Sequence, residues 1–333
     1  MKRKVLLITP DFFKLNELIK ENLSFCGYEV TEGIYYLDEP FKYKNFYQKV
    51  NNFFKKTFVD KDNKRKLGIN FKNRKIEELV STYSENHFDF ALFLTVQFFD
   101  TTLINSVKKK CKRIFAYQFD SITRTPQIAT NIPLFDTFYS FEKKDIGLYP
   151  VKFATNFYFD FNQKSHYPKS IDVFYIGTFV EERMASLLNI IKTIKEANLT
   201  FKIMLFANKK EDLIPYQKYG IEIAEKLLTY KEQEQMASEA KLLIDLKLSV
   251  HDGLSFRFFE AMKLNTKLIT NNQSVKEYDF YSPKNILVTN EDGQMETASL
   301  LALMNSEIDS EKATIFKKYS FTNWLQNQIL YER

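Results

Sequence analysis

Apolar runs of strand length alternate along the first half of the chain with segments of helical spacing. The runs lie at 4–9, 29–36, 88–94, 113–119 and 135–141, and a further short extended piece is expected over 153–159. Apolar residues recur near a helical period over 12–25 and 101–112, which predicts helices there. Because strands and helices alternate, this half predicts a parallel sheet covered by helices.

The same alternation begins again after a polar segment, 160–170, which contains Pro168 and predicts a linker. The second series predicts strands over 172–177, 201–206, 220–224, 242–246, 267–270 and 285–289, and helices over 181–198, 231–241, 255–265 and 295–304. The last segment, 311–331, predicts one helix whose apolar face is formed by Phe321, Trp324, Leu325 and Ile329.

Two α/β domains are therefore expected. The predicted boundaries are 1–162 for the first domain, with an insertion at 41–75, then 170–310 for the second and 311–333 for the C-terminal helix. The 333 residues are enough for two domains, and an apolar fraction of 44% with 16% aromatic residues allows real cores.

Cysteine, histidine and glycine usage argues against several classes of protein. Cys26 and Cys111 form no CxxC motif, and the three histidines are scattered, so a zinc or histidine-based metal site is not expected. The eight glycines form neither GxGxxG nor a Walker loop, which disfavours a dinucleotide oxidoreductase or a P-loop NTPase. Gly177 and Gly253 each follow a predicted strand, a placement that suits a nucleotide site at the carboxyl edge of a parallel sheet.

The N-terminus does not predict a targeting segment. After three basic residues, the first apolar run stops at Pro10-Asp11, unlike a signal peptide. The longest apolar stretch, 88–99, is interrupted by polar residues and is too short to span a bilayer. We therefore expect a cytoplasmic protein that is soluble or peripheral on the inner face of the cell membrane.

The net charge of +6 is concentrated in one basic, aromatic segment. Residues 41–75 contain twelve Lys or Arg residues and only Asp60 and Asp62 as acids. The segment is interpreted as a solvated loop, as a surface for anionic lipid and a lipid-linked acceptor, or as a nucleic-acid contact.

The most informative stretch is 242–272, which predicts a strand, a tight loop, a helix and a second strand. The turn Gly253-Leu254-Ser255, which leads into the helix at Phe256, would direct free backbone N–H groups and the positive end of the helix toward an anion such as a phosphate. Asp252 and Glu260 lie on either side of this turn, eight positions apart. The alternative is an ordinary helix start with one solvated acid and one buried, satisfied acid.

The sequence DGLSFRFFE, from Asp252 to Glu260, resembles the acidic-x7-Glu motif of retaining GT-B glycosyltransferases, with Asp in place of the commoner first Glu. The longer sequence GLSFRFFEAMKLNTKLITNN, followed by YDFY at 278–281, is similar to bacterial glycosyltransferase-like proteins of lipopolysaccharide and capsule synthesis. The resemblance implies a GT-B architecture, with two Rossmann-like domains, a cleft between them and a C-terminal helix that crosses back to the first domain. It also implies that Glu260 holds the ribose hydroxyls, that the 253–256 amides face sugar and phosphate, and that Asp252 contacts the sugar.

A second match lies at DVFYIGTFVEER, which ends at Arg183. In the family, this strand ends in a glycine, and an Arg and a later Lys grip the diphosphate. Arg183 falls at the Lys position, where a guanidinium can serve a phosphate, whereas Thr178 stands where the Arg is expected. One cation is therefore missing unless Lys247 or Arg257 replaces it, and Arg183 itself has the alternative of a solvated residue in the first helical turn.

Four further residues are weaker candidates or have open roles. Asp120, close to Arg124, ends a strand in an aromatic-Asp-Ser sequence that the glycosyltransferase-like proteins also carry; it either orients an acceptor hydroxyl, with a role as general base, or caps the next turn. His251 either contacts the sugar or phosphate or is a bystander. Tyr230 opens the helix that faces the base-binding region in this fold.

The resemblance implies a hexosyltransferase-type enzyme that moves a sugar from a nucleoside-diphosphate sugar to a cell-surface glycan or lipid-linked acceptor. It implies no cofactor and no metal, because fixed cations and dipoles would stabilise the leaving group. The motif suggests retention of anomeric configuration. Two alternatives are a GT-B-shaped binding protein without turnover and a nucleic-acid-binding protein that uses the basic segment, although no nucleic-acid partner is expected.

Overall fold

The computed structural model describes residues 2–41, 63–161 and 168–331. It divides into two compact units. Unit 1 comprises Met1–Ser140 and Asp145–Lys152, and unit 2 comprises Phe141–Lys144 and Phe153–Arg333. Each unit contains one six-stranded sheet.

The sheet of unit 1 has the strand order β2-β1-β3-β4-β5-β6. Its strands are β1 (Lys4–Pro10), β2 (Glu29–Tyr35), β3 (Phe90–Leu94), β4 (Ile114–Gln118), β5 (Thr137–Ser140) and β6 (Lys152–Phe153), where Phe153 already belongs to unit 2. The pairs from β2 to β5 are parallel. The centre of β1, from Val5 to Ile8, is completely buried, as expected for a strand covered on both faces.

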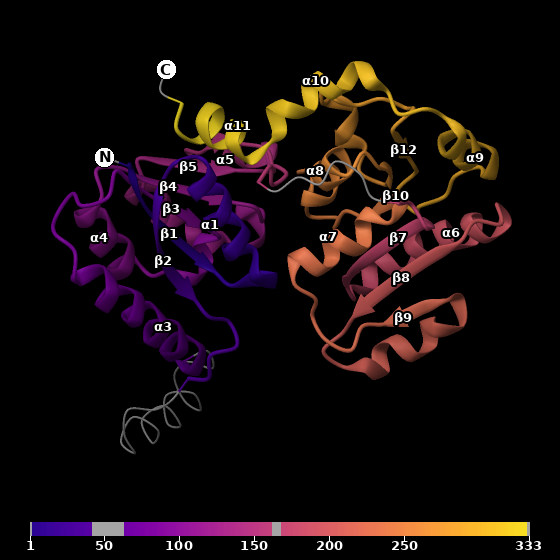
Figure 1. The fold of residues 1–333 in the computed structure, drawn as a ribbon. Coiled ribbons are helices and arrows are strands. Elements are labelled where there is room, and N and C mark those ends of the chain that lie inside the picture. Colours follow the sequence, from indigo (N-terminus) through magenta and orange to yellow (C-terminus); the bar gives the residue numbers. More distant parts are fainter. Residues whose placement is uncertain (1, 42–62, 162–167, 332–333) are drawn as a thin grey trace. The chain divides into compact units, whose positions relative to one another are not determined.

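Helices cover this first sheet (Figure 1). They are α1 (Leu15–Phe25), α3 (Asn63–Ser81) and α4 (Thr101–Lys110), and α5 (Lys143–Leu148) begins in the short segment assigned to unit 2. Two further segments form 3-10 helices: Pro126–Leu134 in unit 1 and Lys210–Tyr219 in unit 2.

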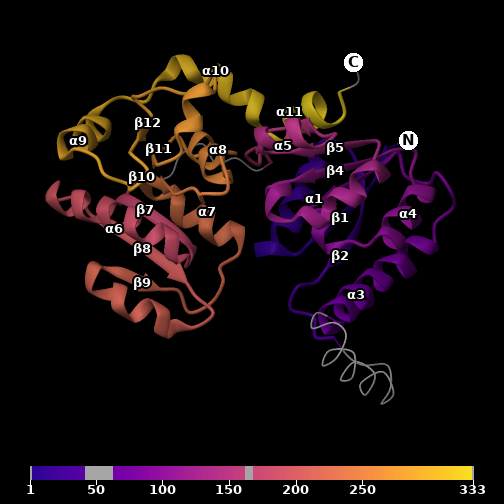
Figure 2. The same ribbon diagram turned by 180° about the vertical axis from the view of Figure 1, so that it is seen from behind.

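The sheet of unit 2 has the order β12-β11-β10-β7-β8-β9, and all its neighbouring strands are parallel. Its strands are β7 (Ile171–Thr178), β8 (Phe201–Phe206), β9 (Ile221–Ile223), β10 (Ala240–Asp245), β11 (Lys267–Thr270) and β12 (Ile286–Val288). Its helices are α6 (Glu181–Glu196), α7 (Tyr230–Ser238), α8 (Phe256–Lys263) and α9 (Thr297–Asn305) (Figure 2).

The two faces of this sheet have separate cores because side chains alternate along a strand. Val173 and Tyr175 of β7 belong to a core with buried residues of α6 and α9, whereas Phe174 and Ile176 belong to a core with α7 and α8. The β7 strand is therefore apolar on both faces, as the sequence indicates.

The prediction of one long C-terminal helix is wrong. Ser320 has extended backbone angles, with φ −70° and ψ 154°, and separates the short turns Ala313–Phe316 and Phe321–Trp324. A parallel bridge between Tyr158 and Ser320 replaces helical hydrogen bonds at this point. The predicted apolar face is nonetheless buried in unit 2, where the Trp324 ring lies 4.3 Å from that of Phe157.

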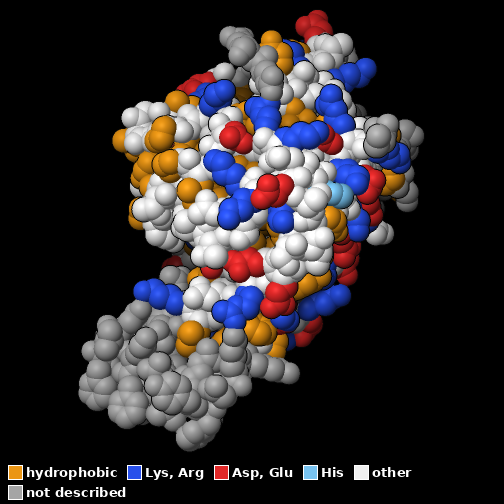
Figure 3. All heavy atoms as spheres, turned by 90° about the vertical axis from the view of Figure 1, so that its left-hand side faces the viewer, with side chains coloured by type: hydrophobic (Ala, Val, Ile, Leu, Met, Phe, Trp, Pro, Cys, Tyr) orange, Lys and Arg blue, Asp and Glu red, His pale blue; other side chains and the backbone are white. Residues whose placement is uncertain are grey.

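Much of the basic segment, 42–62, lies outside the described residues. Its last part belongs to α3, where Lys72 is almost buried and donates to the carbonyl of Leu37, and Lys75 forms an ion pair with Glu39. Figure 3 shows Lys and Arg side chains mixed with acidic ones on the face that carries α3 and α4. None of the helices within the described ranges has the length and apolar character to cross a membrane.

Candidate functional site

The candidate site lies in unit 2, at the carboxyl ends of β7 and β10. The chain leaves β7 through α6 toward β8 on one side, whereas β10 and β11 continue the sheet on the other side. Ligands of open parallel sheets bind at such a reversal of strand order. Helices α6 and α8 both begin near this edge, at Glu181 and Phe256.

Asp245, the last residue of β10, is a buried acid that the sequence analysis missed. Its carboxylate accepts hydrogen bonds from Ser255 Oγ at 2.6 Å and from Thr270 Oγ1 at 3.1 Å. Burial raises the pKa of Asp245, and the hydrogen bonds together with the charges of Arg183 and Arg257 oppose that effect. A single acid at the end of the apolar run LLID was the signal that could have identified it.

Two arginines act electrostatically on Asp245. Arg183 and Arg257 both act on the pKa of Asp245 and on that of Tyr175, which is raised chiefly by burial. Arg257 donates from Nη2 to the carbonyl of Ile176 at 3.2 Å and pairs through Nε with Glu260 at 3.1 Å. Arg183 Nε and Arg257 Nη1 are buried and have no hydrogen-bond partner among the described residues. Buried guanidinium donors without partners favour an anionic ligand at this point.

Glu260 lies on α8 with its side chain only 9% exposed. It neighbours Tyr230, the first residue of α7, whose hydroxyl is also buried. Burial raises the pKa of Tyr230, and the negative charge of Glu260 adds to that rise. Three of the predicted site residues therefore lie together in the structure: Arg257, Glu260 and Tyr230.

The loop before α8 differs from the prediction of free amides. The backbone N–H groups of Asp252 and Gly253 both donate to Glu142 Oε2, at 2.8 and 3.0 Å. This carboxylate comes from the segment Phe141–Lys144 and is almost completely buried. The expectation that the Gly253 amide is open to a phosphate is thus wrong, because a carboxylate of the chain already accepts its hydrogen bond.

Asp252 is held by two lysines. It forms an ion pair with Lys144 and a second with Lys247 Nζ at 3.1 Å. Burial alone would raise the pKa of Asp252, but the hydrogen bonds from both lysines outweigh it and hold the pKa below its usual value. Lys247 is therefore engaged with Asp252, whereas Arg257 is the cation that accompanies Arg183.

The other predicted residues of unit 2 differ in exposure. Thr178 is exposed at the end of β7, while Leu254 is buried and its carbonyl accepts from Asn156 Nδ2 at 2.9 Å. The ring of Phe256 packs edge-on against Phe157, and Ser255 caps α8 by accepting from Arg257 N. His251 is half-buried, with its ring 5.6 Å from that of Phe141.

Asp120 and Arg124 lie in unit 1, after β4. Their side chains form a partly exposed ion pair, with both Arg124 Nη1–carboxylate distances at 3.4 Å. Asp120 Oδ1 also accepts from the N–H of Ser121, whose own side chain caps the following turn. The turn is thus capped by the neighbour of Asp120, and the acceptor role of Asp120 stays a prediction.

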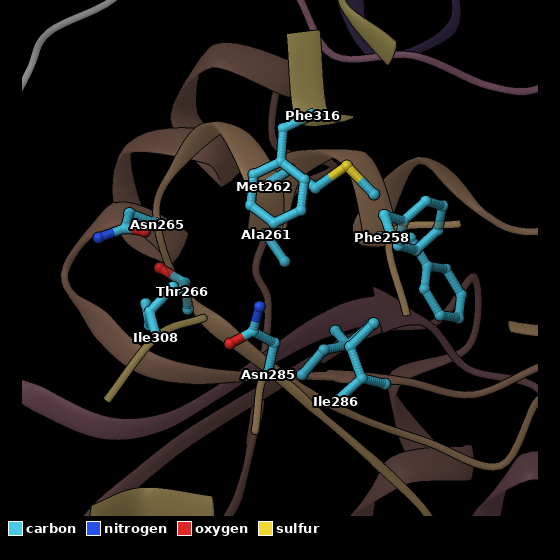
Figure 4. A pocket seen from close by; sticks show the side chains of 11 residues that line it. Phe258, Ala261, Met262, Asn265, Thr266, Asn285, Ile286, Ile308 and Phe316 are labelled. Atoms are coloured by element: carbon cyan, nitrogen blue, oxygen red, sulfur yellow. The ribbon is translucent and has the colours of Figure 1, made fainter. Parts of the chain in front are cut away.

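A small apolar pocket lies at the opposite end of α8 from this site. Its side chains come from α8, β11, β12 and the C-terminal segment, and Figure 4 shows Met262 and Phe316 above Ala261. Its volume of about 20 Å³ accommodates little more than one water molecule. Within the ranges that the structure describes, no group of three or more His, Cys, Asp or Glu side chains could hold a metal ion.

Comparison with known proteins identifies the fold. No protein-family model matches the sequence, and no curated protein is significantly similar to it. Among solved structures, the chain is similar to the apo form of the lipopolysaccharide outer core galactosyltransferase WaaB, with 12% identity, a TM-score of 0.54 and 97% of both chains covered. It is also similar to AviGT4, a glycosyltransferase involved in avilamycin A biosynthesis, with 9% identity, a TM-score of 0.60 and 97% of this chain and 95% of that chain covered.

A glycosyltransferase from Rickettsia africae ESF-5 gives a similar result, with 10% identity, a TM-score of 0.56 and 98% and 96% coverage of this chain and that chain. These matches extend over nearly the whole chain, and each unit has the parallel six-stranded sheet that the fold requires. The protein has the α/β fold of the GT-B glycosyltransferases.

Proposed function

We propose that the protein is a glycosyltransferase that takes a sugar from a nucleoside-diphosphate sugar and passes it to a cell-surface glycan or lipid-linked acceptor. The observation that carries this proposal is the pair of arginines beside Asp245. Both present buried N–H groups, Arg183 Nε and Arg257 Nη1, that lack a partner in the part of the chain that the structure describes, at the strand-order reversal of unit 2. Such a site suits the diphosphate of the donor.

In the proposed reaction, the bond between the anomeric carbon and the donor phosphate oxygen breaks, and its electron pair leaves with the nucleoside diphosphate. The acceptor hydroxyl oxygen forms the new bond to that carbon and releases its proton. Arg183 and Arg257 stabilise the negative charge that develops on the leaving group, so the site needs no metal for this purpose. Arg257 takes the place of the cation that is missing at Thr178.

The remaining roles follow the acidic-x7-Glu resemblance. Glu260 binds the ribose hydroxyls, and Asp252 contacts the donor sugar. Asp120 orients the acceptor hydroxyl or accepts its proton. The galactosyltransferase WaaB acts in lipopolysaccharide outer core synthesis, which supports a cell-surface glycan as the acceptor class.

A thermal-shift titration with nucleoside diphosphates and their sugars tests the donor site. A ligand that binds only the folded state at a hundred times its Kd stabilises it by about 2.7 kcal/mol, so a rise in Tm is expected for the wild type. Arg183→Ala and Arg257→Ala should abolish the rise. Lys192→Ala is the matched control, because Lys192 lies on α6 with an exposed side chain. An undiminished response of both arginine variants would contradict the site.

Turnover separates the enzyme from a binding protein of the same shape. The purified chain is incubated with a panel of nucleotide sugars, and release of nucleoside diphosphate is measured with and without glycan acceptors. An enzyme releases it by transfer or by slow hydrolysis. A donor that raises Tm but is never consumed with any acceptor favours the binding protein.

A further inference from the structure

The short segment Phe141–Lys144 is anchored to the rest of unit 2 at every residue. The ring of Phe141 packs edge-on against His251, and Lys143 Nζ pairs with Glu277 at 2.7 Å. Lys144 pairs with Asp252, and Glu142 accepts the two loop amides. These contacts fix the segment against the loop 250–253.

Gly253 shows that the sequence of the loop is adapted to this contact. A Cβ atom at Gly253 would lie 2.6 Å from ring carbons of Phe141 and 2.8 Å from its carbonyl oxygen. A side chain at this position would therefore push the segment away from the loop. The glycine that predicts a close approach of phosphate instead permits a close approach of the chain itself.

The Glu142 carboxylate is a structural acceptor of the loop amides and not a group that a ligand displaces from them. It is 1% exposed, and hydrogen bonds from N–H groups to an ionised oxygen are about twice as strong as neutral ones. Withdrawal of this carboxylate would leave the buried amide of Gly253 and the partly buried amide of Asp252 without their acceptor.

We propose that Glu142 is a positioning residue of the donor site. Its carboxylate fixes the loop so that Asp252, held between Lys144 and Lys247, faces the donor sugar, and the diphosphate is bound by Arg183 and Arg257 in place of the loop amides. The orientation of Asp252 toward the donor sugar rests on the proposed function. The role of Glu142 in fixing the loop concerns the ligand-free protein alone, so the two parts of the proposal can fail separately.

Hydrogen exchange tests the loop in the absence of ligand. The amides of Asp252 and Gly253 should be protected in the wild type, and Glu142→Ala should speed their exchange by about tenfold or more. Glu142→Gln keeps one oxygen acceptor and should retain part of the protection. Glu277→Gln is the matched control, because it removes the more exposed carboxylate that contacts the same segment. Unchanged exchange at both amides in folded Glu142→Ala would overturn the proposal.

Kinetics then test the positioning role. In Glu142→Ala, kcat should fall by roughly ten- to a hundredfold because Asp252 is misplaced. Nucleoside-diphosphate affinity should change by less than about twofold, and Glu142→Gln should recover part of kcat. Tighter nucleoside-diphosphate binding by Glu142→Ala would overturn the proposal, since it would mean that the carboxylate competes with phosphate. If the wild type binds no nucleotide, the proposed function fails, whereas the exchange result still decides the role of Glu142 in the loop.

Discussion

Both units contain a six-stranded α/β sheet, but they differ in strand order and in the chemistry at the reversal of that order. In unit 2, Arg183 and Arg257 lie around the buried Asp245. In unit 1, the ends of β1 and β3 are lined by aromatic rings, with Phe98 5.4 Å from Phe12 and 5.2 Å from Tyr35. The strand ends thus carry arginines and a buried acid in one unit and aromatic rings in the other, and function depends on the residues that a fold positions.

The two units also differ in backbone strain, which in unit 1 occurs directly after strands of the sheet. Phe13, Lys14 and Thr95 follow β1 and β3 with φ of 48°, 58° and 55°, angles that side chains other than glycine rarely adopt. In unit 2, the comparable residues are Asn198 and Asn265, which follow the ends of α6 and α8, where asparagine commonly takes this conformation. Strain that persists at a site is typical of a functional surface, so unit 1 is where we expect the acceptor.

The largest effect on stability is expected from a change in the charged group formed by Asp245, Arg183 and Arg257 in unit 2. Asp245→Ala removes a buried carboxylate that accepts hydrogen bonds from Ser255 and Thr270 and whose charge offsets those of Arg183 and Arg257, so it should lower the free energy of unfolding by about 3–5 kcal/mol. Asp11→Ala is the matched change in unit 1, where the carboxylate accepts the N–H of Leu37 at 2.8 Å, and it should cost about 1–2 kcal/mol. Urea unfolding measures both. Equal losses in the free energy of unfolding would mean that the acids at the strand ends of the two units contribute equally to stability.

The next effect concerns close packing at the loop. Gly253→Ala should lower the free energy of unfolding by about 1–3 kcal/mol, because its Cβ meets Phe141. Gly147→Ala is the control, since a Cβ there has no neighbour within 4 Å and Gly147 lies in α5. It should raise stability by about 0.5–1 kcal/mol. A Gly253→Ala protein as stable as the wild type would show that the loop and Phe141 can move apart at little cost in free energy.

A smaller effect addresses the strain of unit 1. Lys14→Gly removes a side chain from a left-handed backbone, and the relief of about 1–2 kcal/mol should exceed the entropic cost of glycine. A net gain of up to about 1 kcal/mol in the free energy of unfolding is expected. Lys20→Gly, in the middle of α1, should instead lose about 1 kcal/mol. A lower free energy of unfolding for both variants would show that the backbone at Lys14 is not strained.

Buried strands were the most predictable part of the fold. The predicted limits of β8 and β11 agree with the structure at every residue, since each is a short apolar run between polar residues. The predicted helix 231–241 extended too far, because Ala240 and Lys241 pair in β10, where neighbouring strands decide over helical propensity. The C-terminal helix failed for a similar reason, since the pairing of Ser320 with Tyr158 is a long-range contact.

The candidate site was predictable only in part. Arg183, Arg257 and Glu260 follow or flank recognisable turns, so local sequence places them at one edge of the sheet. Glu142 is 110 residues away from the amide of Asp252 that it binds, and no local pattern indicates such a contact. Only the folded chain shows that the Gly253 amide already has a carboxylate acceptor.

The smallest expected effect is a pH dependence confined to the loop of unit 2. The pKa of Asp252 is lower in the folded protein than in the unfolded chain, where it is about 3.9, because Lys144 and Lys247 outweigh the effect of burial. The unfolded state therefore binds more protons between the two values, so the stabilisation by Asp252 is complete above the unfolded pKa and is lost as pH falls through the folded pKa. The stability difference between the wild type and Asp252→Asn should accordingly be constant near neutral pH and shrink below about pH 4. Urea unfolding from pH 3 to pH 7 measures it, and a difference that grows in acid would show that the lysines do not hold this carboxylate.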